Sequence, residues 1–144
     1  MISSAFANDL LKLIFNATAI SGIADNASSS PLANLFMSLH TADPGASGSQ
    51  STSECNYTGY SRMSVARGGG GFTITGAVMN PTATMEFGEM SGGTAQTATH
   101  MCIGTASSGS GKVLFRFAIS PTISINTNTI PRIRDTTTLT VVTS

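Results

Sequence analysis

The sequence predicts a mainly β fold, an antiparallel β-sandwich or jelly-roll-like domain with an amphipathic helix at its N-terminus. Short segments rich in β-branched and aromatic residues recur along the chain, and Gly, Pro, Asn and Ser separate them. Regular short strands of this kind are typical of antiparallel sandwiches. One segment near the start has helical rather than alternating periodicity, and 144 residues suit a single domain with a real core.

The helix is predicted from the segment SAFANDLLKLIFNATAI. Its apolar residues follow the rhythm of one helical face, and they are Phe6, Leu10, Leu13, Ile14 and Ala17. Ser3 or Ser4 can cap the start, and Ser21-Gly22 is expected to mark the end. Two interpretations stay open: the helix packs on its own domain, or it is an arm whose apolar stripe docks on a partner. We therefore expect a helix or arm at 1–21 and one β-sandwich domain at 22–144.

About eight strands are expected after the turn-rich connector at 22–31. In the first of them, Leu35, Met37 and Leu39 alternate with polar or aromatic neighbours. The run Gly68–Gly71 is interpreted as a hairpin tip. The segments expected to contain strands are 32–41, 61–67, 71–75, 83–87, 98–106, 112–119, 122–128 and 137–142.

A long loop, 42–60, follows the first expected strand. Asp43-Pro44-Gly45 enforces a turn, because proline restricts φ and glycine permits positive φ. A structureless stretch of this length in a small domain is usually functional or forms an interface. Tyr57 and Tyr60 lie near its end. We expect Asp43, Pro44 and both tyrosines to be contact residues, together with the helical stripe of Phe6, Leu10, Leu13 and Ile14.

The composition favours a protein that works by contact. Charged residues make up only 10% of the chain, which carries 20 Ser and 20 Thr, whereas soluble domains typically have about 25% charged residues. A surface made polar by hydroxyl groups is cheap to desolvate against protein. A hydroxyl-rich β-protein that is merely neutral is the alternative.

Nucleic acid and membrane are not expected partners. The formal net charge is zero, and no basic run exceeds the three residues RIR at 132–134. Arg62 and Arg67 near the two tyrosines are a weak pattern for RNA stacking and are interpreted as an ordinary polar strand face. The apolar start is interrupted by polar residues and has no preceding basic region, so we expect neither a secretory signal nor a membrane span. Cys55 and Cys102 are interpreted as free thiols, although one disulfide stays open.

The segment GTASSGSGKV (104–113) resembles a phosphate-binding loop at first sight. Aligning Gly111-Lys112 with the Gly-Lys step of that motif places Ala106 where its first glycine belongs and Val113 where its Mg²⁺ ligand belongs. The motif also opens a helix, whereas VLFRFAI continues as a strand. We interpret the segment as the turn of a β-hairpin.

No catalytic, metal or cofactor site is predicted. His40 lies near Asp43 in the sequence, and His100 shares a strand face with Cys102, but neither pair supplies the three or four ligands of a zinc site. Glu86 and Glu89 fall on opposite faces at strand spacing and make a poor acid–base pair. The chain is therefore not expected to be an enzyme.

Three segments together resemble a family of small virion proteins of tailed phages and prophages. They are the stretch from Ser4 to Gly45, YTGYSRMSVAR (57–67) and THMCIGTASSGSGKVLF (99–115), so the resemblance covers nearly the whole chain. Members are commonly labelled tail or tail-fibre proteins, and the chain also resembles the cement or decoration proteins that bind an HK97-type capsid shell. The resemblance implies a jelly-roll-like β fold and brings no catalytic residues. Met101 and Cys102 stand where the resemblance implies other apolar or aromatic residues, which affects packing alone.

A capsid cement protein is the first functional expectation. Many copies would join neighbouring capsomers from outside, and modest contacts repeated on a lattice would add up through effective concentration. The expected partners are the major capsid protein and further copies of the chain, as dimers or trimers, and the expected location is the virion, assembled in the bacterial cytoplasm. The alternative is a structural protein of the tail or tail fibre.

Overall fold

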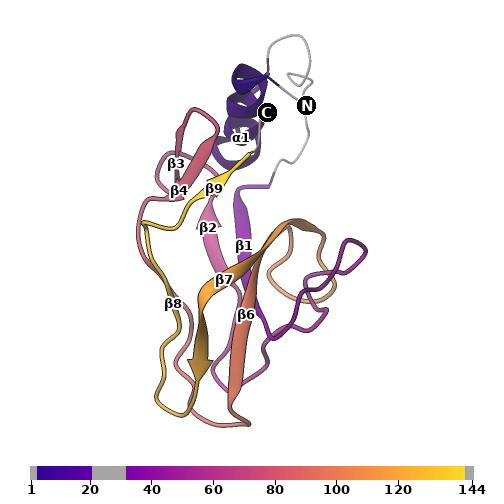
Figure 1. Cartoon of the computed structure of the whole chain (residues 1–144), viewed down its shortest axis with the longest axis vertical. Helices are drawn as coiled ribbons and strands as arrows, with labels where there is room; N and C mark the ends of the chain where they lie inside the picture. The colour runs from indigo at the N-terminus through magenta and orange to yellow at the C-terminus, as the bar shows by residue number, and fades with distance from the viewer. Residues whose placement is uncertain (1–2, 21–31, 142–144) are drawn as a thin grey trace. The chain divides into compact units, whose positions relative to one another are not determined.

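The computed structural model describes residues 3–20 and 32–141, and Figure 1 shows the chain with its elements labelled. The fold is mainly β, built from antiparallel strands with one N-terminal helix, which confirms the predicted fold class. The expected helix end at Ser21-Gly22 and the whole connector at 22–31 lie outside the described residues.

Contacts divide the chain into two compact units. Residues 1–33, 66–85 and 133–144 form one, here called the helical unit, and residues 34–65 and 86–132 form the other, the sheet unit. The N-terminal helix shares its unit with two segments that are distant in the sequence. The domain boundary expected at residue 21 stays a prediction. The pairs of strands that follow are described within each unit.

The helix α1 (Ser4–Asn16) begins and ends at recognisable caps. The Ser3 hydroxyl oxygen accepts a hydrogen bond from the Phe6 backbone N–H at 3.2 Å. Ala17 ends the helix in the left-handed conformation, with φ of 54°. The N-cap was predicted correctly, and the last helical residue lies a few positions before the expected stop.

The buried face of α1 is not the predicted one. The fully buried side chains are Ala7, Leu11 and Phe15, a row at i, i+4 and i+8. The predicted stripe of Phe6, Leu10, Leu13 and Ile14 is only half-buried. Apolar residues cover so wide an arc of this helix that the pattern alone did not show which part of the arc faces its own unit.

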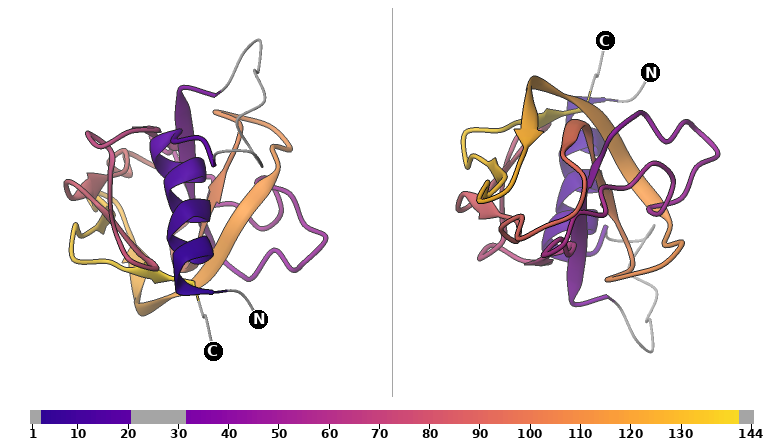
Figure 2. Two further views of the ribbon diagram at one scale, coloured as in Figure 1. Left: turned by 90° about the horizontal axis from the view of Figure 1, so that it is seen from above. Right: turned by 90° about the horizontal axis from the view of Figure 1, so that it is seen from below.

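The helix packs on a small sheet of order β3-β4-β9, made of β3 (Phe72–Thr75), β4 (Val78–Pro81) and β9 (Leu139–Thr140). The Phe15 and Phe72 rings meet edge to face with centroids 4.8 Å apart. The left view of Figure 2 shows α1 as one continuous helix. The helix is therefore held by the core of its own unit through Leu11 and Phe15.

Arg67 holds the C-terminal end of α1. Its guanidinium donates to the carbonyl oxygens of Leu13 at 2.8 Å, Ile14 at 2.7 Å and Leu32 at 2.8 Å. Carbonyl groups in the last turn of a helix have no partner within the helix, and a cation there also interacts favourably with the helix dipole. The last turn of α1 contains no basic residue that could bind these carbonyl groups. Arg67, more than fifty residues later in the sequence, binds them instead.

The sheet unit contains a four-stranded antiparallel sheet of order β2-β1-β6-β7. Its strands are β2 (Met63–Ala66), β1 (Asn34–His40), β6 (Gln96–Gly104) and β7 (Val113–Ile125). On one face, Leu39 pairs with Met101 and Met37 with Ile103, and all four side chains are buried. The hairpin predicted around GTASSGSGKV is confirmed, since β6 and β7 pair on either side of it.

Both faces of β1 are buried at its end, although the sequence alternates. Ser38 and His40, on the face opposite Leu39, are fully buried. The long loop covers them, because the Thr41 N–H donates to the Ser53 carbonyl and the Cys55 N–H to the Leu39 carbonyl. A strand that the sequence presents as half-exposed is therefore enclosed by the loop that follows it.

Three further features differ from expectation. The segments 112–119 and 122–128 belong largely to one strand, β7, which continues through a cis Ser120–Pro121 bond.

The strand β4 was missed because its Asn80-Pro81 reads as a turn. Gly68–Gly71 joins β2 to β3, which lie in different sheets, so the run is a connection and not a hairpin tip. The short strands β5 (Met85–Glu86) and β8 (Arg132–Ile133) pair with each other as a two-stranded sheet.

Candidate functional site

A buried ion pair lies at the centre of the sheet unit's loops. The Arg62 Nε is 2.7 Å from the Glu54 Oε1, and Arg62 Nη2 is 2.7 Å from Glu54 Oε2. The Arg62 side chain is 2% exposed and that of Glu54 15%. This bidentate geometry is the strongest arrangement available to the two groups, and the hydrogen bonds to Glu54 raise the pKa of Arg62 above its usual value.

The same guanidinium holds the β6–β7 hairpin. Arg62 donates through Nη1 to the Ala106 carbonyl at 2.9 Å and through Nη2 to the Gly109 carbonyl at 2.6 Å. Two loops that are distant in sequence are thereby joined through one side chain. The interpretation of Arg62 as part of an ordinary polar strand face was wrong, because burial and four hydrogen bonds within the chain occupy it.

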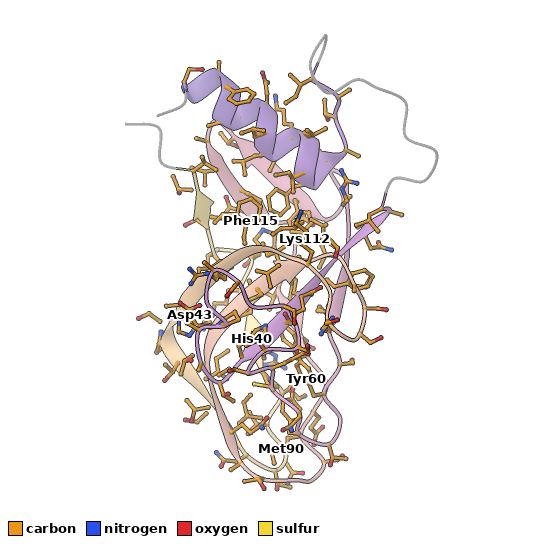
Figure 3. The ribbon with its side chains drawn as sticks, turned by 90° about the vertical axis from the view of Figure 1, so that its right-hand side faces the viewer. His40, Asp43, Tyr60, Met90, Lys112 and Phe115 are labelled. Carbon is orange, nitrogen blue, oxygen red and sulfur yellow. The ribbon has the colours of Figure 1, made fainter. Side chains whose placement is uncertain are left out.

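Tyr60 connects this ion pair to the sheet. Its hydroxyl donates to Glu54 Oε1 at 2.9 Å and accepts from the Leu39 N–H at 3.0 Å. Burial, and next the charge of Glu54, raise the pKa of Tyr60 far above its usual range. Its ring stacks on Phe87 with centroids 6.3 Å apart. Figure 3 labels Tyr60 and His40, which lie in the same region of the sheet unit.

Tyr57 is buried against Tyr60. The two rings meet edge to face with centroids 5.3 Å apart, and the Tyr57 hydroxyl donates to the Gly88 carbonyl at 2.9 Å. Desolvation raises the pKa of Tyr57 to about 12. Only 3% of Tyr57 is exposed, so the residue contributes to the core of the loop and little to its surface.

Gln50 organises the base of the hairpin. Its Oε1 accepts from the Ala106 N–H at 3.0 Å, and its Nε2 donates to the Phe36 carbonyl at 3.2 Å. The Gln50 backbone N–H donates to the Gly111 carbonyl at 2.9 Å. A Cβ atom at Gly104 or Gly111 would overlap the Gln50 side chain. These glycines make room for a buried amide rather than for a phosphate.

A pocket of about 390 Å³ opens beside the ion pair. The 54–62 segment of the long loop lines one side of it, and the hairpin tip with Ser107, Ser108 and Gly109 lines the other. All of its lining residues belong to the sheet unit. The long loop and the Gly/Ser hairpin, which the sequence presents as separate features, thus enclose one concave site.

The turn at Asp43 has the predicted geometry. Gly45 has φ of 77°, and its N–H donates to Asp43 Oδ1 at 2.9 Å. Arg116 Nη1 donates to the same oxygen at 2.6 Å. These two hydrogen bonds, that of Gly45 first, lower the pKa of Asp43. Asp43 is exposed, whereas Pro44 is buried under the turn.

His40 is buried in a polar site within the loop. Its Nδ1 lies 2.8 Å from the Thr52 carbonyl, and its Nε2 lies 2.9 Å from the Ser38 hydroxyl. Because a carbonyl only accepts, Nδ1 carries the proton and Nε2 accepts from Ser38. Desolvation lowers the pKa of His40. The register places His40 opposite His100 and Ser38 opposite Cys102.

The eight expected contact residues fall into three groups. Five are exposed or half-buried apolar or charged side chains, one is the half-buried Tyr60, and two are buried within the chain. Whether any of them contacts a partner stays a prediction, and the buried pair would have to be uncovered to do so. The first group is Phe6, Leu10, Leu13, Ile14 and Asp43; the buried pair is Pro44 and Tyr57.

Sequence reasoning missed the importance of Glu54, Arg62 and Gln50. Each is a polar residue in a segment that reads as a loop, and its burial follows from contacts with residues up to about fifty positions away. The one available signal was the clustering of Glu54 and Arg62 with two tyrosines inside a weakly charged chain. Because the chain has few charged residues, each of them has few possible ion-pair partners.

Within residues 3–20 and 32–141, no three His, Cys, Asp or Glu side chains gather as a metal site requires. Over the same residues, no helix has the length and apolar character needed to cross a bilayer. Cys55 and Cys102 are free and buried, in agreement with the preferred interpretation.

The chain matches a family of phage fibre proteins over nearly its whole length. The model of a family described as "Podophage GP4 fiber I protein gp80" matches residues 1–141 of this chain. No curated protein matches it.

Proposed function

Because the chain belongs to the family described as Podophage GP4 fiber I protein gp80, we propose that it is a structural subunit of the fibre or tail of a phage particle. The observation that carries the proposal is the extent of the match, 141 of 144 residues. Membership makes the chain a virion protein of fibre or tail type. It favours the tail alternative over the capsid cement protein that we expected first.

The structure is compatible with a role based on contact. The chain carries few charges and many hydroxyl groups, and a surface of this kind is cheap to desolvate against another protein. The helix α1 anchors itself with Leu11 and Phe15 while Phe6, Leu10 and Leu13 stay half-buried. This division leaves part of the apolar arc for a neighbouring virion subunit or a second copy.

We expect no enzymatic step and no cofactor in this role. The described residues offer an ion pair and two tyrosine hydroxyls whose hydrogen bonds are used within the chain. This stays a prediction, which the assembly experiments below do not depend on.

The number of copies in the particle tests the location. We expect a subunit of the tail or fibre in about a dozen copies, because closed rotational symmetry limits a ring to a small number of subunits. Quantitative gel densitometry of purified virions, with antibody labelling in electron micrographs, should give that number and place the label at the tail. Hundreds of copies spread over the shell would contradict the proposal and support the cement role.

Two helix variants test the contact surface. Leu10→Asp should prevent incorporation into particles while the purified chain stays folded, since Leu10 is only half-buried. Leu11→Ala is the matched control for damage to the core, and it should lower the free energy of unfolding by about 3 kcal/mol. Normal incorporation of the Leu10→Asp protein would show that this stripe does not contact a partner.

A further inference from the structure

The pocket beside Arg62 and Glu54 has a size and a lining that could accommodate a small ligand. It has about 390 Å³ of space, within the range of about 300–1,000 Å³ that small-molecule sites occupy. It is lined by the long loop and by the hairpin tip, and Arg62 ties the two together. The walls are therefore fixed relative to each other before any ligand arrives.

The pocket is electrically neutral. Glu54 and Arg62 compensate each other at 2.7 Å, and the other lining residues are uncharged. Burial raises the pKa of the Cys55 thiol to about 11 and that of Tyr57 to about 12, so both stay protonated near neutral pH. Neither an anion nor a cation finds an unpaired opposite charge here.

The charged groups have little capacity left for an ionic ligand. Arg62 already makes four hydrogen bonds within the chain, and its side chain is almost fully buried. Both Glu54 oxygens accept from Arg62, and one also accepts from Tyr60. A phosphate or a metal ion would have to break this network, which costs several kcal/mol when a buried pair loses a partner.

The exposed rim offers the opposite chemistry, namely neutral hydrogen-bonding groups. Ser61, Ser107 and Ser108 are exposed, and within the described part of the chain no hydrogen bond uses their hydroxyls. Asn56 is also exposed, and its Oδ1 accepts from Gln96 while its own amide N–H groups face no described acceptor. Each hydroxyl can both donate and accept, and the half-buried Tyr60 adds an aromatic surface.

We propose that this pocket binds a neutral carbohydrate, one sugar unit of a glycan. Sugar hydroxyls can donate to and accept from the serine hydroxyls and the Asn56 amide, and the apolar C–H face of a sugar ring fits the part of the Tyr60 ring that is exposed. The site requires no charge on the ligand. The inference concerns the isolated chain and does not depend on its place in the particle.

The test is a titration of the isotope-labelled full chain followed by NMR. The probes are uncharged methyl glycosides of glucose, galactose, mannose and rhamnose, together with N-acetylglucosamine, and inorganic phosphate is the anionic comparison. We expect saturable shifts at the amides of Asn56, Ser61, Ser107 and Ser108 for at least one sugar. Phosphate should not displace it.

A matched pair of variants separates the pocket from the rest of the hairpin. Ser107→Ala combined with Ser108→Ala should weaken sugar binding about tenfold, since two hydrogen bonds are lost. Ser110→Ala changes an exposed serine of the same hairpin that does not line the pocket, and it should bind as the wild type does. The proposal is overturned if no sugar of the panel gives saturable shifts there, if both variants bind equally, or if phosphate competes. None of these results bears on the copy number that tests the fibre role.

Discussion

Arg62 and Glu54 form a two-point ion pair whose arginine is almost completely removed from solvent. Through the same guanidinium, the long loop is bound to the carbonyl groups of the β6–β7 hairpin. Tyr60 adds a hydrogen bond from the carboxylate to β1. One charged pair thus determines the relative positions of a loop, a hairpin and a strand within the sheet unit.

Removing this arginine should be costly. Arg62→Ala leaves a largely buried carboxylate and two carbonyl groups without their donors, and we expect a loss of about 3 kcal/mol in the free energy of unfolding. Chemical denaturation followed by circular dichroism measures it. Arg116→Ala is the control, because its pair with Asp43 is 37% and 44% exposed and should be worth less than about 1 kcal/mol. Equal losses in the two variants would refute the special role of Arg62.

Gly88→Ala should destabilise the sheet unit. A Cβ atom at Gly88 would overlap the backbone carbonyl of Gly59, and a backbone cannot move aside as a flexible side chain can. We expect a loss of more than about 2 kcal/mol from this overpacking. Gly69→Ala is the control, since nothing lies within 4 Å of its added Cβ, and its midpoint of denaturation should stay near that of the wild type. A stable Gly88→Ala protein would mean that the two loop segments are not in contact.

The two cysteines should resist alkylation in the folded protein. Burial raises the pKa of Cys55 to about 11 and that of Cys102 to about 12, and the thiolate is the reactive form. At about pH 8, only about one Cys55 thiol in a thousand is ionised. Mass spectrometry after iodoacetamide treatment should show no label on the native chain and two labels in denaturant. Rapid labelling of the native chain would contradict the burial of both residues.

His40 should make the protein less stable in mild acid. Its folded-state pKa lies below the ordinary 6.5, so below that pH the unfolded chain takes up a proton that the folded chain does not. The stability contributed by neutral His40 is present above about pH 6.5 and is lost as the pH falls toward the folded pKa, by at most about 1.4 kcal/mol per pH unit. Denaturation midpoints across this range measure the slope. His40→Gln should reduce it, and an unchanged slope would assign the effect to other groups.

Arg67→Ala should loosen the end of α1. The variant removes three charge-assisted hydrogen bonds to carbonyl groups of the helix and its neighbourhood, and we expect a loss of about 2 kcal/mol. Hydrogen exchange should accelerate at the amides of the last helical turn. Arg134→Ala, at an exposed arginine, is the control and should leave that exchange unchanged. Unchanged exchange in Arg67→Ala would show that the helix end does not depend on this side chain.

The sequence by itself determined the local structure of this protein. Alternation at Leu35, Met37 and Leu39 predicted β1, and the Gly/Ser run between two β-rich segments predicted the β6–β7 hairpin. The Ser3 cap and the Asp43-Pro44-Gly45 turn were also predicted, because each depends on residues only a few positions apart. Local geometry of this kind follows from side-chain chemistry and backbone preference, whatever the rest of the chain does.

Only the tertiary structure decided which polar residues are buried and which helical face points inward. The sequence presents Glu54, Arg62 and Gln50 as loop residues. The hairpin, about fifty positions later, supplies partners for Arg62 and Gln50, and Arg62 in turn pairs with Glu54. The face of α1 that carries Leu11 and Phe15 is buried because Phe15 packs on Phe72. The end of the helix is stabilised by Arg67, which donates to the Ile14 carbonyl. The physical reason is that burying a charge or an amide is favourable only when a distant group satisfies it, and no local pattern records where that group lies.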